Sequence, residues 1–139
     1  MISVILDAGP LVAAINPNDT YHEWVIAQLS QIKPPFLSCE AVISEACFLS
    51  QGRVKHIEAV LRWVNNDSIG VTCILEKEKK IIQQYMLKYA NVPMSFADAC
   101  LVRMAELYPD SPVFTLDSDF YIYRKYGNQV ISLIIPDRH

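Results

Sequence analysis

The segment ISVILDAGP (residues 2–10) places a short apolar run directly before an aspartate, a glycine and a proline. The run from Ile2 to Leu6 is rich in β-branched residues and predicts a buried strand, and DAGP predicts the turn that ends it. Asp7 would then lie at the carboxyl end of that strand, where open α/β sheets place their ligand crevice. A role as a turn or helix-cap residue, which aspartate commonly serves, explains Asp7 equally well.

Outward from this segment, strand-like and helix-like patterns alternate along the chain. Further strands are expected at 36–39, 69–75, 113–116 and 130–135. Helices are expected from residue 10, over 20–32, 41–51 and 54–65, from 76 towards Pro93, and over 96–108, with a turn and short helix at 117–126. Thr20 and Glu23 have the spacing of a capping box for the second helix. The alternation predicts a three-layer α/β/α sandwich on a mainly parallel sheet.

The composition predicts one compact domain over residues 1–139. This length suffices to bury a core, and the hydrophobic content of 52% argues against disorder. The formal net charge of -3 gives no basic footprint of the kind that a general nucleic-acid binder shows. No apolar run approaches the roughly 20 residues that cross a bilayer, and the amino terminus lacks the basic region of a signal peptide. We therefore expect a cytoplasmic protein without a membrane partner.

Cysteines and histidines give no pattern for a thiol or imidazole site. The four cysteines include no C-x-x-C pair, and three lie in apolar stretches, so reduced core thiols are expected: Cys39, Cys47, Cys73 and Cys100. The three histidines lie in a capping segment, a charged surface turn and the carboxyl terminus: His22, His56 and His139. A metal-free ribonuclease that uses two histidines is therefore not expected.

Two acidic residues lie within apolar helical segments. Glu45 falls at helical spacing among Val42, Phe48 and Leu49, where an unpaired carboxylate would be costly. The alternative is that the core face of the helix lies elsewhere and leaves Glu45 partly solvated. Asp98 shares its face with apolar residues of the 96–108 helix. Ser95 is expected to cap that helix, and Ser95-x-x-Asp98 also has capping-box spacing, so Asp98 can serve the helix start, a site, or both.

Acidic residues recur after the strand at 113–116. Asp117 follows this strand as Asp7 follows the first, so both carboxylates are expected at the same rim of the sheet. Strand alternation places Thr115 on the face of Asp117, and Asp119 either caps the following turn or reaches the site. Carboxylates brought close together repel one another unless a proton or a hard cation intervenes. Asp7, Glu45, Asp98 and Asp117 together therefore predict divalent-metal chemistry, most plausibly on phosphodiesters.

The chain resembles the PIN-domain nuclease family, especially its small bacterial and archaeal members of VapC-toxin type. The matching pieces occur in the family's order: VILDAGPLVAAI (4–15), ISEACFL (43–49), SFADACLVRMA (95–105) and VFTLDSDF (113–120). DTYHEWV (19–25) also resembles the family's first long helix. The resemblance covers essentially the whole chain. One departure is Ala8-Gly9-Pro10, which replaces the more usual polar residue after the aspartate.

What the resemblance implies is an endoribonuclease that hydrolyses RNA with Mg²⁺ or Mn²⁺. Asp7, Glu45, Asp98 and Asp117 would correspond to the family's catalytic, metal-binding acids, with Asp119 as an accessory metal ligand. Ser95 and Thr115 match polar positions beside that quartet. The resemblance also implies a homodimer and, for a chain of this size, a toxin with a cognate antitoxin.

Two other functions stay open at this stage: a stand-alone RNA-processing nuclease, and a non-catalytic PIN scaffold that binds RNA or protein. Four basic residues either line an approach for phosphates or are ordinary solvated charges: Arg53, Lys55, Arg124 and Lys125. Three tyrosines either stack on bases or serve core packing and dimer contacts: Tyr121, Tyr123 and Tyr126.

Overall fold

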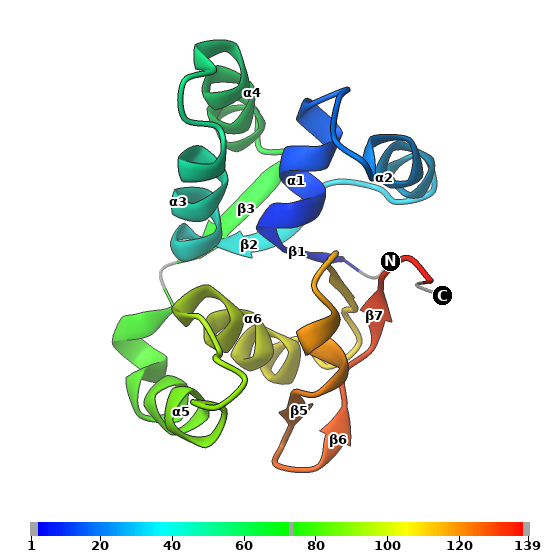
Figure 1. The fold of residues 1–139 in the computed structure, drawn as a ribbon. Helices are drawn as coiled ribbons and strands as arrows, with labels where there is room; N and C mark the ends of the chain where they lie inside the picture. Colours follow the sequence, from blue (N-terminus) through cyan, green and yellow to red (C-terminus); the bar gives the residue numbers. More distant parts are fainter. Residues whose placement is uncertain (1–2, 73, 138–139) are drawn as a thin grey trace.

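A five-stranded parallel sheet forms the centre of the molecule (Figure 1). The computed structural model describes residues 3–72 and 74–137. The sheet has the order β3-β2-β1-β4-β7, and every neighbouring pair is parallel. Its strands are β1 (Ile5–Leu6), β2 (Phe36–Cys39), β3 (Ile69–Thr72), β4 (Val113–Phe114) and β7 (Leu133–Ile134). The predicted mainly parallel sheet is confirmed.

Helices cover both faces of the sheet, which confirms the three-layer α/β/α sandwich (Figure 1). One face carries α1 (Ala8–Ile15), α2 (His22–Leu29), α3 (Glu40–Leu49) and α4 (Val54–Asn65); the other carries α5 (Leu75–Lys88) and α6 (Phe96–Leu107). The two sets follow from right-handed crossovers, because the chain moves outward from β1 to β3 and then returns to β4 on the other side of β1. In the described ranges, no helix is long and apolar enough to span a membrane.

The reversal of strand order between β1 and β4 decides where a ligand crevice forms. In open α/β sheets this switch point lies beyond the carboxyl ends of the strands, where the connections diverge to opposite faces. β1 pairs with β4 in the register Ile5 to Val113 and Leu6 to Phe114. The residues that follow these two strands, including Asp7 and Thr115, therefore meet at one point of the sheet edge.

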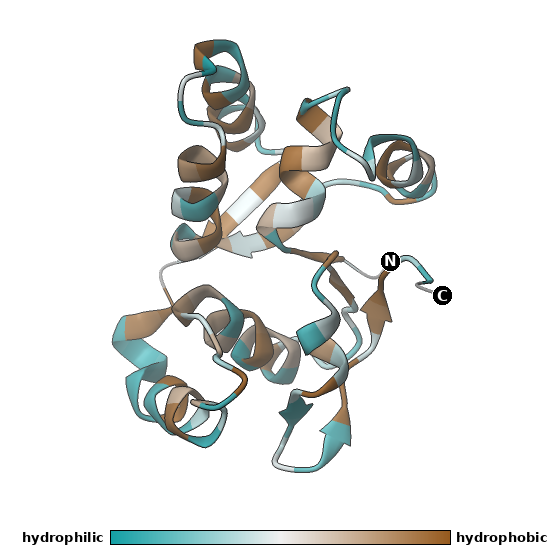
Figure 2. Cartoon of the chain, in the orientation of Figure 1, coloured by the Kyte–Doolittle hydropathy of each residue, from teal (hydrophilic) through white to brown (hydrophobic). Residues whose placement is uncertain are grey.

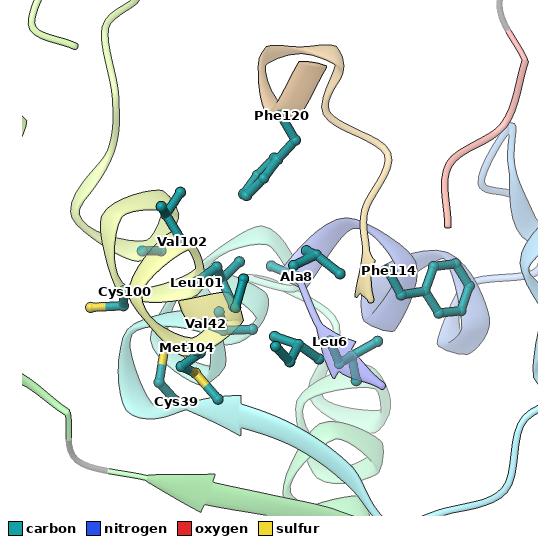
Figure 3. Close-up of a cluster of buried hydrophobic side chains, with 14 of the residues drawn as sticks. Leu6, Ala8, Cys39, Val42, Cys100, Leu101, Val102, Met104, Phe114 and Phe120 are labelled. Atoms are coloured by element: carbon teal, nitrogen blue, oxygen red, sulfur yellow. The ribbon is translucent and has the colours of Figure 1, made fainter. Parts of the chain in front are cut away.

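The core lies on both faces of the sheet, and α6 is buried along most of its length. Figure 3 shows Leu6 of β1, Val42 of α3, and Leu101 and Met104 of α6 gathered in one cluster, and all four side chains are almost fully buried. Hydrophobic residues predominate along α6 and the central strands, whereas hydrophilic residues cover much of α5 (Figure 2). Burial of α6 on nearly all sides holds its first turn, with Asp98, rigidly against the sheet.

Three cysteines are free thiols, and Cys39 and Cys100 among them are buried, as the apolar setting predicts. Cys47 is half-buried, and Cys73 lies outside the described residues, as does His139.

The predicted capping box of the second helix does not form. The Asp19 carboxylate accepts the Tyr21 backbone N–H at 2.9 Å, and the Asp19 carbonyl accepts the His22 N–H at 3.0 Å. This aspartate turn delays the start of α2 to His22, so Thr20 and Glu23 do not cap it. The helix also ends at Leu29, before the predicted residue 32. By contrast, α1 begins at Ala8, earlier than predicted, because Asp7 caps it.

A β-hairpin that the sequence analysis missed follows the short 3-10 helix at Ser118–Tyr121. It pairs β5 (Arg124–Lys125) with β6 (Gln129–Val130), so the strand predicted at 130–135 is split between β6 and β7. The turn needs positive φ at Tyr126 (52°) and Gly127 (85°), and a tyrosine rarely adopts this conformation. The Glu106 carboxylate accepts the Tyr126 backbone N–H, so a distant contact stabilises the turn.

Glu106 is the centre of a polar cluster that joins α5, α6 and the hairpin. Its carboxylate accepts hydrogen bonds from the Tyr85 hydroxyl, the Tyr126 N–H and, at 3.0 Å, the Arg103 guanidinium. Arg103 also donates to Glu78 of α5 at 2.8 Å. The Glu106 side chain is only 3% exposed, so removing it would leave buried donors without an acceptor.

Glu106→Ala is expected to lower the free energy of unfolding by about 3 kcal/mol, because it breaks a buried charged network. Urea unfolding followed by circular dichroism measures this change. Glu58→Ala is the matched control, since Glu58 forms a helical pair with Arg62 at 3.3 Å on the exposed surface. Its loss should stay below about 1 kcal/mol. Equal losses in the two variants would contradict the role of Glu106.

Candidate active site

Asp7 lies at the carboxyl end of β1 and is only 6% exposed. Its Oδ1 accepts the Ala8 backbone N–H at 2.7 Å as the cap of α1, and its Oδ2 accepts the Thr115 hydroxyl at 2.7 Å. Burial raises the pKa of the carboxyl to about 7, against the two hydrogen bonds that lower it, and the charges of Asp98 and Glu45 raise it further. Both interpretations of Asp7 therefore apply: it caps a helix and it lies at the rim of the sheet.

Thr115 connects the ends of the two central strands. Its hydroxyl donates to Asp7 and accepts the Asp117 backbone N–H at 3.0 Å, and the side chain is fully buried. The Asp117 carboxylate in turn accepts the Asp119 N–H at 2.9 Å and caps the 3-10 helix. Thr115 thus orients one carboxylate directly and fixes the backbone of a second.

Asp98 enters the same region from the first turn of α6. The Ser95 hydroxyl accepts the Asp98 N–H at 3.0 Å, which confirms Ser95 as the helix cap. The Asp98 Oδ2 accepts the Tyr123 hydroxyl at 2.8 Å. Burial raises the pKa of the Asp98 carboxyl, the hydrogen bonds from Tyr123 and Ser95 lower it, and the charge of Asp117 raises it. Tyr123 therefore fixes the Asp98 carboxyl, and the Ser95 cap fixes the backbone that carries it.

Glu45 reaches the cluster from the middle of α3. Partial removal from water raises the pKa of its carboxyl, and the charges of Asp98 and Asp117 raise it further. Its side chain is exposed and lines a cavity between α3 and the start of α6, together with Phe48 and Phe96. Of the two alternatives for Glu45, the structure shows the solvated one, because α3 turns Val42 and Ala46 to the core instead. The charge of Glu45 nevertheless interacts with those of Asp98 and Asp117.

Asp119 lies at the edge of the cluster and is half-buried. Its pKa is raised by burial and then by the charge of Asp117, which shows that the two carboxylates interact. Asp117, not Asp119, caps the turn.

The structure thus brings together acids from four separated segments, and electrostatic coupling links Asp7, Glu45, Asp98 and Asp117. In residues 3–72 and 74–137, none of these carboxylates forms a salt bridge with a lysine, arginine or histidine. The same ranges hold no three acidic, thiol or imidazole side chains close enough to enclose a metal ion by themselves. The carboxylates therefore interact through their charges without forming a closed cage.

Comparison with known proteins assigns the fold. No family model and no curated protein matches the sequence. The solved structure of VapC20 from Mycobacterium tuberculosis, described as a toxin that cleaves the sarcin–ricin loop, matches with a TM-score of 0.75. The match covers 84% of this chain and 92% of that chain at 17% sequence identity. The chain has a PIN-like fold.

Within this PIN-like fold, Tyr123 packs in the core, one of the roles considered for it, but sequence reasoning missed its contact with Asp98. Its side chain is fully buried, its ring packs against Phe120 and Tyr89, and its hydroxyl ends on Asp98. Burial, followed by the hydrogen bond to Asp98, raises the pKa of the phenol well above its ordinary value. No local pattern indicates this contact, because the two residues are 25 positions apart.

His22 and His56 lie outside the acidic cluster. His22 bonds through Nδ1 to the Ala13 carbonyl at 2.6 Å, and no hydrogen bond or ion pair joins His56 to another described side chain.

The metal-free protein is expected to lose stability as the pH rises from about 4 to about 7. The folded-state pKa of Asp7, about 7, lies above the ordinary value of 3.8, so the folded protein keeps a proton that the unfolded chain releases. This stabilisation is complete below about pH 4 and disappears as the pH rises through the folded-state pKa. Asp7→Asn should therefore reduce the slope of the unfolding free energy against pH.

Urea unfolding in EDTA at several pH values measures this slope. Asp110→Asn is the control, because Asp110 is an exposed carboxylate in the loop before β4. This loop lies at the amino-terminal ends of the strands, opposite the acidic cluster. The control should keep the wild-type slope. A wild-type slope in Asp7→Asn would show that Asp7 does not titrate in this range.

Proposed function

We propose that this protein is a divalent-metal-dependent endoribonuclease and that Asp7, Glu45, Asp98 and Asp117 form its active site. The observation that carries the proposal is the meeting of these four carboxylates at the switch point of a parallel sheet, without a paired cation among the described residues. Burying mutually repelling carboxylates is unfavourable, and a hard cation relieves the repulsion. The PIN-like fold supports the same function.

Mg²⁺ or Mn²⁺ fits the chemistry of this donor set. Mg²⁺ prefers oxygen ligands, keeps several of its waters and is usually bound through one or two carboxylates plus substrate phosphates. A preformed cage of three protein ligands is therefore not required, and the described residues hold none. Asp7, Asp98 and Asp117 would hold the ion, with Glu45 holding it or orienting water, and Asp119 as an accessory ligand. A bound ion would acidify a water and neutralise charge that develops on the phosphate.

The residues around the acids position them. Thr115 holds Asp7 by a hydroxyl bond and Asp117 through its backbone, while Tyr123 and Ser95 hold Asp98. Glu45 is the exposed member, so it is accessible to water and substrate. Asp7 accepts two hydrogen bonds from fixed donors and Asp98 accepts one from Tyr123, and each carboxylate keeps further lone pairs that could bind a metal ion.

The biological role that the PIN-like fold favours is a cytoplasmic toxin with a cognate antitoxin, since VapC20 is described as a toxin that cleaves RNA of the sarcin–ricin loop. Large apolar side chains are exposed on α3 and α4: Phe48, Leu49, Val54 and Leu61. These are a natural surface for the proposed homodimer or for an antitoxin. A stand-alone RNA-processing nuclease has the same active site, and a non-catalytic scaffold has the same fold without turnover.

Asp98→Asn is expected to lower RNA cleavage by about 1,000-fold or more, because metal binding contributes several kcal/mol to the transition state. Purified protein is incubated with labelled structured and single-stranded RNAs in Mg²⁺, Mn²⁺ or EDTA. Asp110→Asn, outside the site, should retain full activity, and the wild type should lose activity in EDTA. An active Asp98→Asn variant would contradict the assignment.

Expression in cells separates the remaining roles. Growth arrest by the wild type but not by Asp98→Asn would favour a toxin, whereas tolerated expression together with cleavage in vitro would favour a processing enzyme. Absence of cleavage together with absence of metal binding in calorimetry would favour the scaffold.

Tyr123→Phe is expected to raise the Mg²⁺ concentration for half-maximal cleavage by about 10- to 100-fold. The tyrosine does not touch the metal, but its hydroxyl orients Asp98, and such supporting contacts have effects of this size. The control is Tyr121→Phe, because Tyr121 is 52% exposed and lies only two residues away. If excess Mg²⁺ does not restore cleavage by Tyr123→Phe, the positioning role is wrong.

A further inference from the structure

A second cavity runs along α1 beside the carboxylates, with a volume of about 510 Å³. Its lining comes from one face of α1, the loop before α2, the end of α3, the turn before α4 and the residue before Asp117, and it includes Gly9, Asn16, Asn18, Asp19, Arg53 and Leu116. We call this cavity the α1 groove. Most of the loop residues that line it carry amide, hydroxyl or carboxylate groups, so it suits a polar ligand with hydrogen-bonding edges.

One end of the α1 groove reaches the active-site acids. Gly9 lies two residues after Asp7, and Leu116 directly precedes Asp117. An ideal Cβ on Gly9 would lie 3.3 Å from the Leu116 side chain, so the two segments are in close contact there. Asn16, at the end of α1, lies about 10 Å from Gly9 along the helix at 1.5 Å per residue, and Arg53 lines the same groove. A strand bound at the acids can therefore continue into the groove.

Arg53 is the cation of this groove. Its side chain is exposed, and no hydrogen bond or salt bridge joins it to another described residue. Two of the other basic residues near the site are engaged elsewhere. The Arg124 guanidinium donates to the carbonyls of Tyr121, Ile122 and Tyr123, and Lys125 donates to the Pro109 carbonyl. Lys55 does not line the cavity.

The cavity on the other side of α3 holds only negative charge, whereas the α1 groove combines one cation, Arg53, with one carboxylate, Asp19. The former cavity has a volume of about 640 Å³ and contains Glu40 and Glu45, but no lysine or arginine. A phosphodiester leaving the acids in that direction would meet further negative charge, whereas in the α1 groove it would meet Arg53. Because the protein carries a net charge of -3, a local cation is the main source of attraction for a phosphate.

We propose that the α1 groove binds the RNA strand next to the scissile phosphate and that Arg53 contacts a backbone phosphate there. The inference rests on the proposed nuclease function and adds the path of the substrate and a specific binding residue. Asn18, whose exposed side chain lies in the same groove, offers an amide to a base edge. Arg53 supplies affinity, and the loop over 16–21 supplies selectivity.

The test measures RNA binding in an inactive background, so that cleavage does not interfere. Asp98→Asn protein is titrated with a fluorescent pool of random single-stranded RNA in Mg²⁺ at several salt concentrations. Adding Arg53→Gln should weaken binding by about 5- to 10-fold at low salt and reduce the slope of log affinity against log salt by about 0.7, the value for one lost phosphate contact on a single strand.

Two controls keep the result specific. Lys80→Gln removes an exposed, unpaired cation on α5, outside the groove, and should change neither affinity nor slope. Asn18→Ala should weaken binding without changing the slope, because it removes no charge. Since the Arg53 side chain makes no hydrogen bond in the described structure, its replacement should leave the unfolding curve unchanged.

If Arg53→Gln changes neither the RNA affinity nor its salt dependence, the proposal that the α1 groove binds RNA is wrong. This result is expected if the surface binds a protein partner instead. Absence of RNA binding by the Asp98→Asn parent would also overturn it. Cleavage of the same pool by the wild type with Mg²⁺ tests the nuclease separately. If the wild type cleaves RNA but Arg53→Gln does not weaken binding, the proposed nuclease function stands and the proposed groove is wrong. If binding depends on Arg53 but the wild type does not cleave, the proposed groove stands and the nuclease function is wrong.

Discussion

The Thr115 hydroxyl links the carboxyl ends of β1 and β4, and the geometry of the acidic cluster depends on this contact. It donates to one carboxylate and accepts from the backbone that carries another, across 108 residues of sequence. The two strands are adjacent because the chain returns to β1 after building β2 and β3. Strand order, rather than any local motif, therefore creates the site, and α6 completes it by bringing Asp98 to the same edge.

Burial of these acids has a cost in the absence of a cation. Burial is the largest cause of the raised pKa at Asp7, Glu45 and Asp98 alike, and mutual repulsion adds to it. A fold selected only for stability would place apolar or paired side chains here. The contrast with Glu106 is informative, because that buried carboxylate is surrounded by an arginine and two tyrosines. Glu106 is thus paired with a cation within the protein, whereas Asp7, Glu45 and Asp98 have no such pair among the described residues.

Sequence reasoning predicted the parallel sheet, the α4 bounds and the cap at Ser95, because these follow from periodicity and local hydrogen bonding. It placed the acids together through strand ends and the family resemblance. It failed where distant contacts decide: the hairpin turn at Tyr126 depends on Glu106, and Asp19 displaces the predicted cap at Thr20. Burial and exposure of Glu45 both stayed open because α3 is apolar nearly all round, so periodicity cannot identify its core face. The contact between Tyr123 and Asp98 was missed for the same reason as the hairpin.

The charge distribution reconciles a negatively charged protein with a negatively charged substrate. A broad basic surface would bind many RNAs tightly, and this chain has none at a net charge of -3. In the proposed nuclease, attraction would then come from a divalent ion held among the acids and from single cations at defined positions. Recognition that depends on so few charges would be weak unless the shape of the RNA brought its phosphates to both positions at once. In that case shape complementarity in the α1 groove, rather than net charge, would separate a substrate from other RNA.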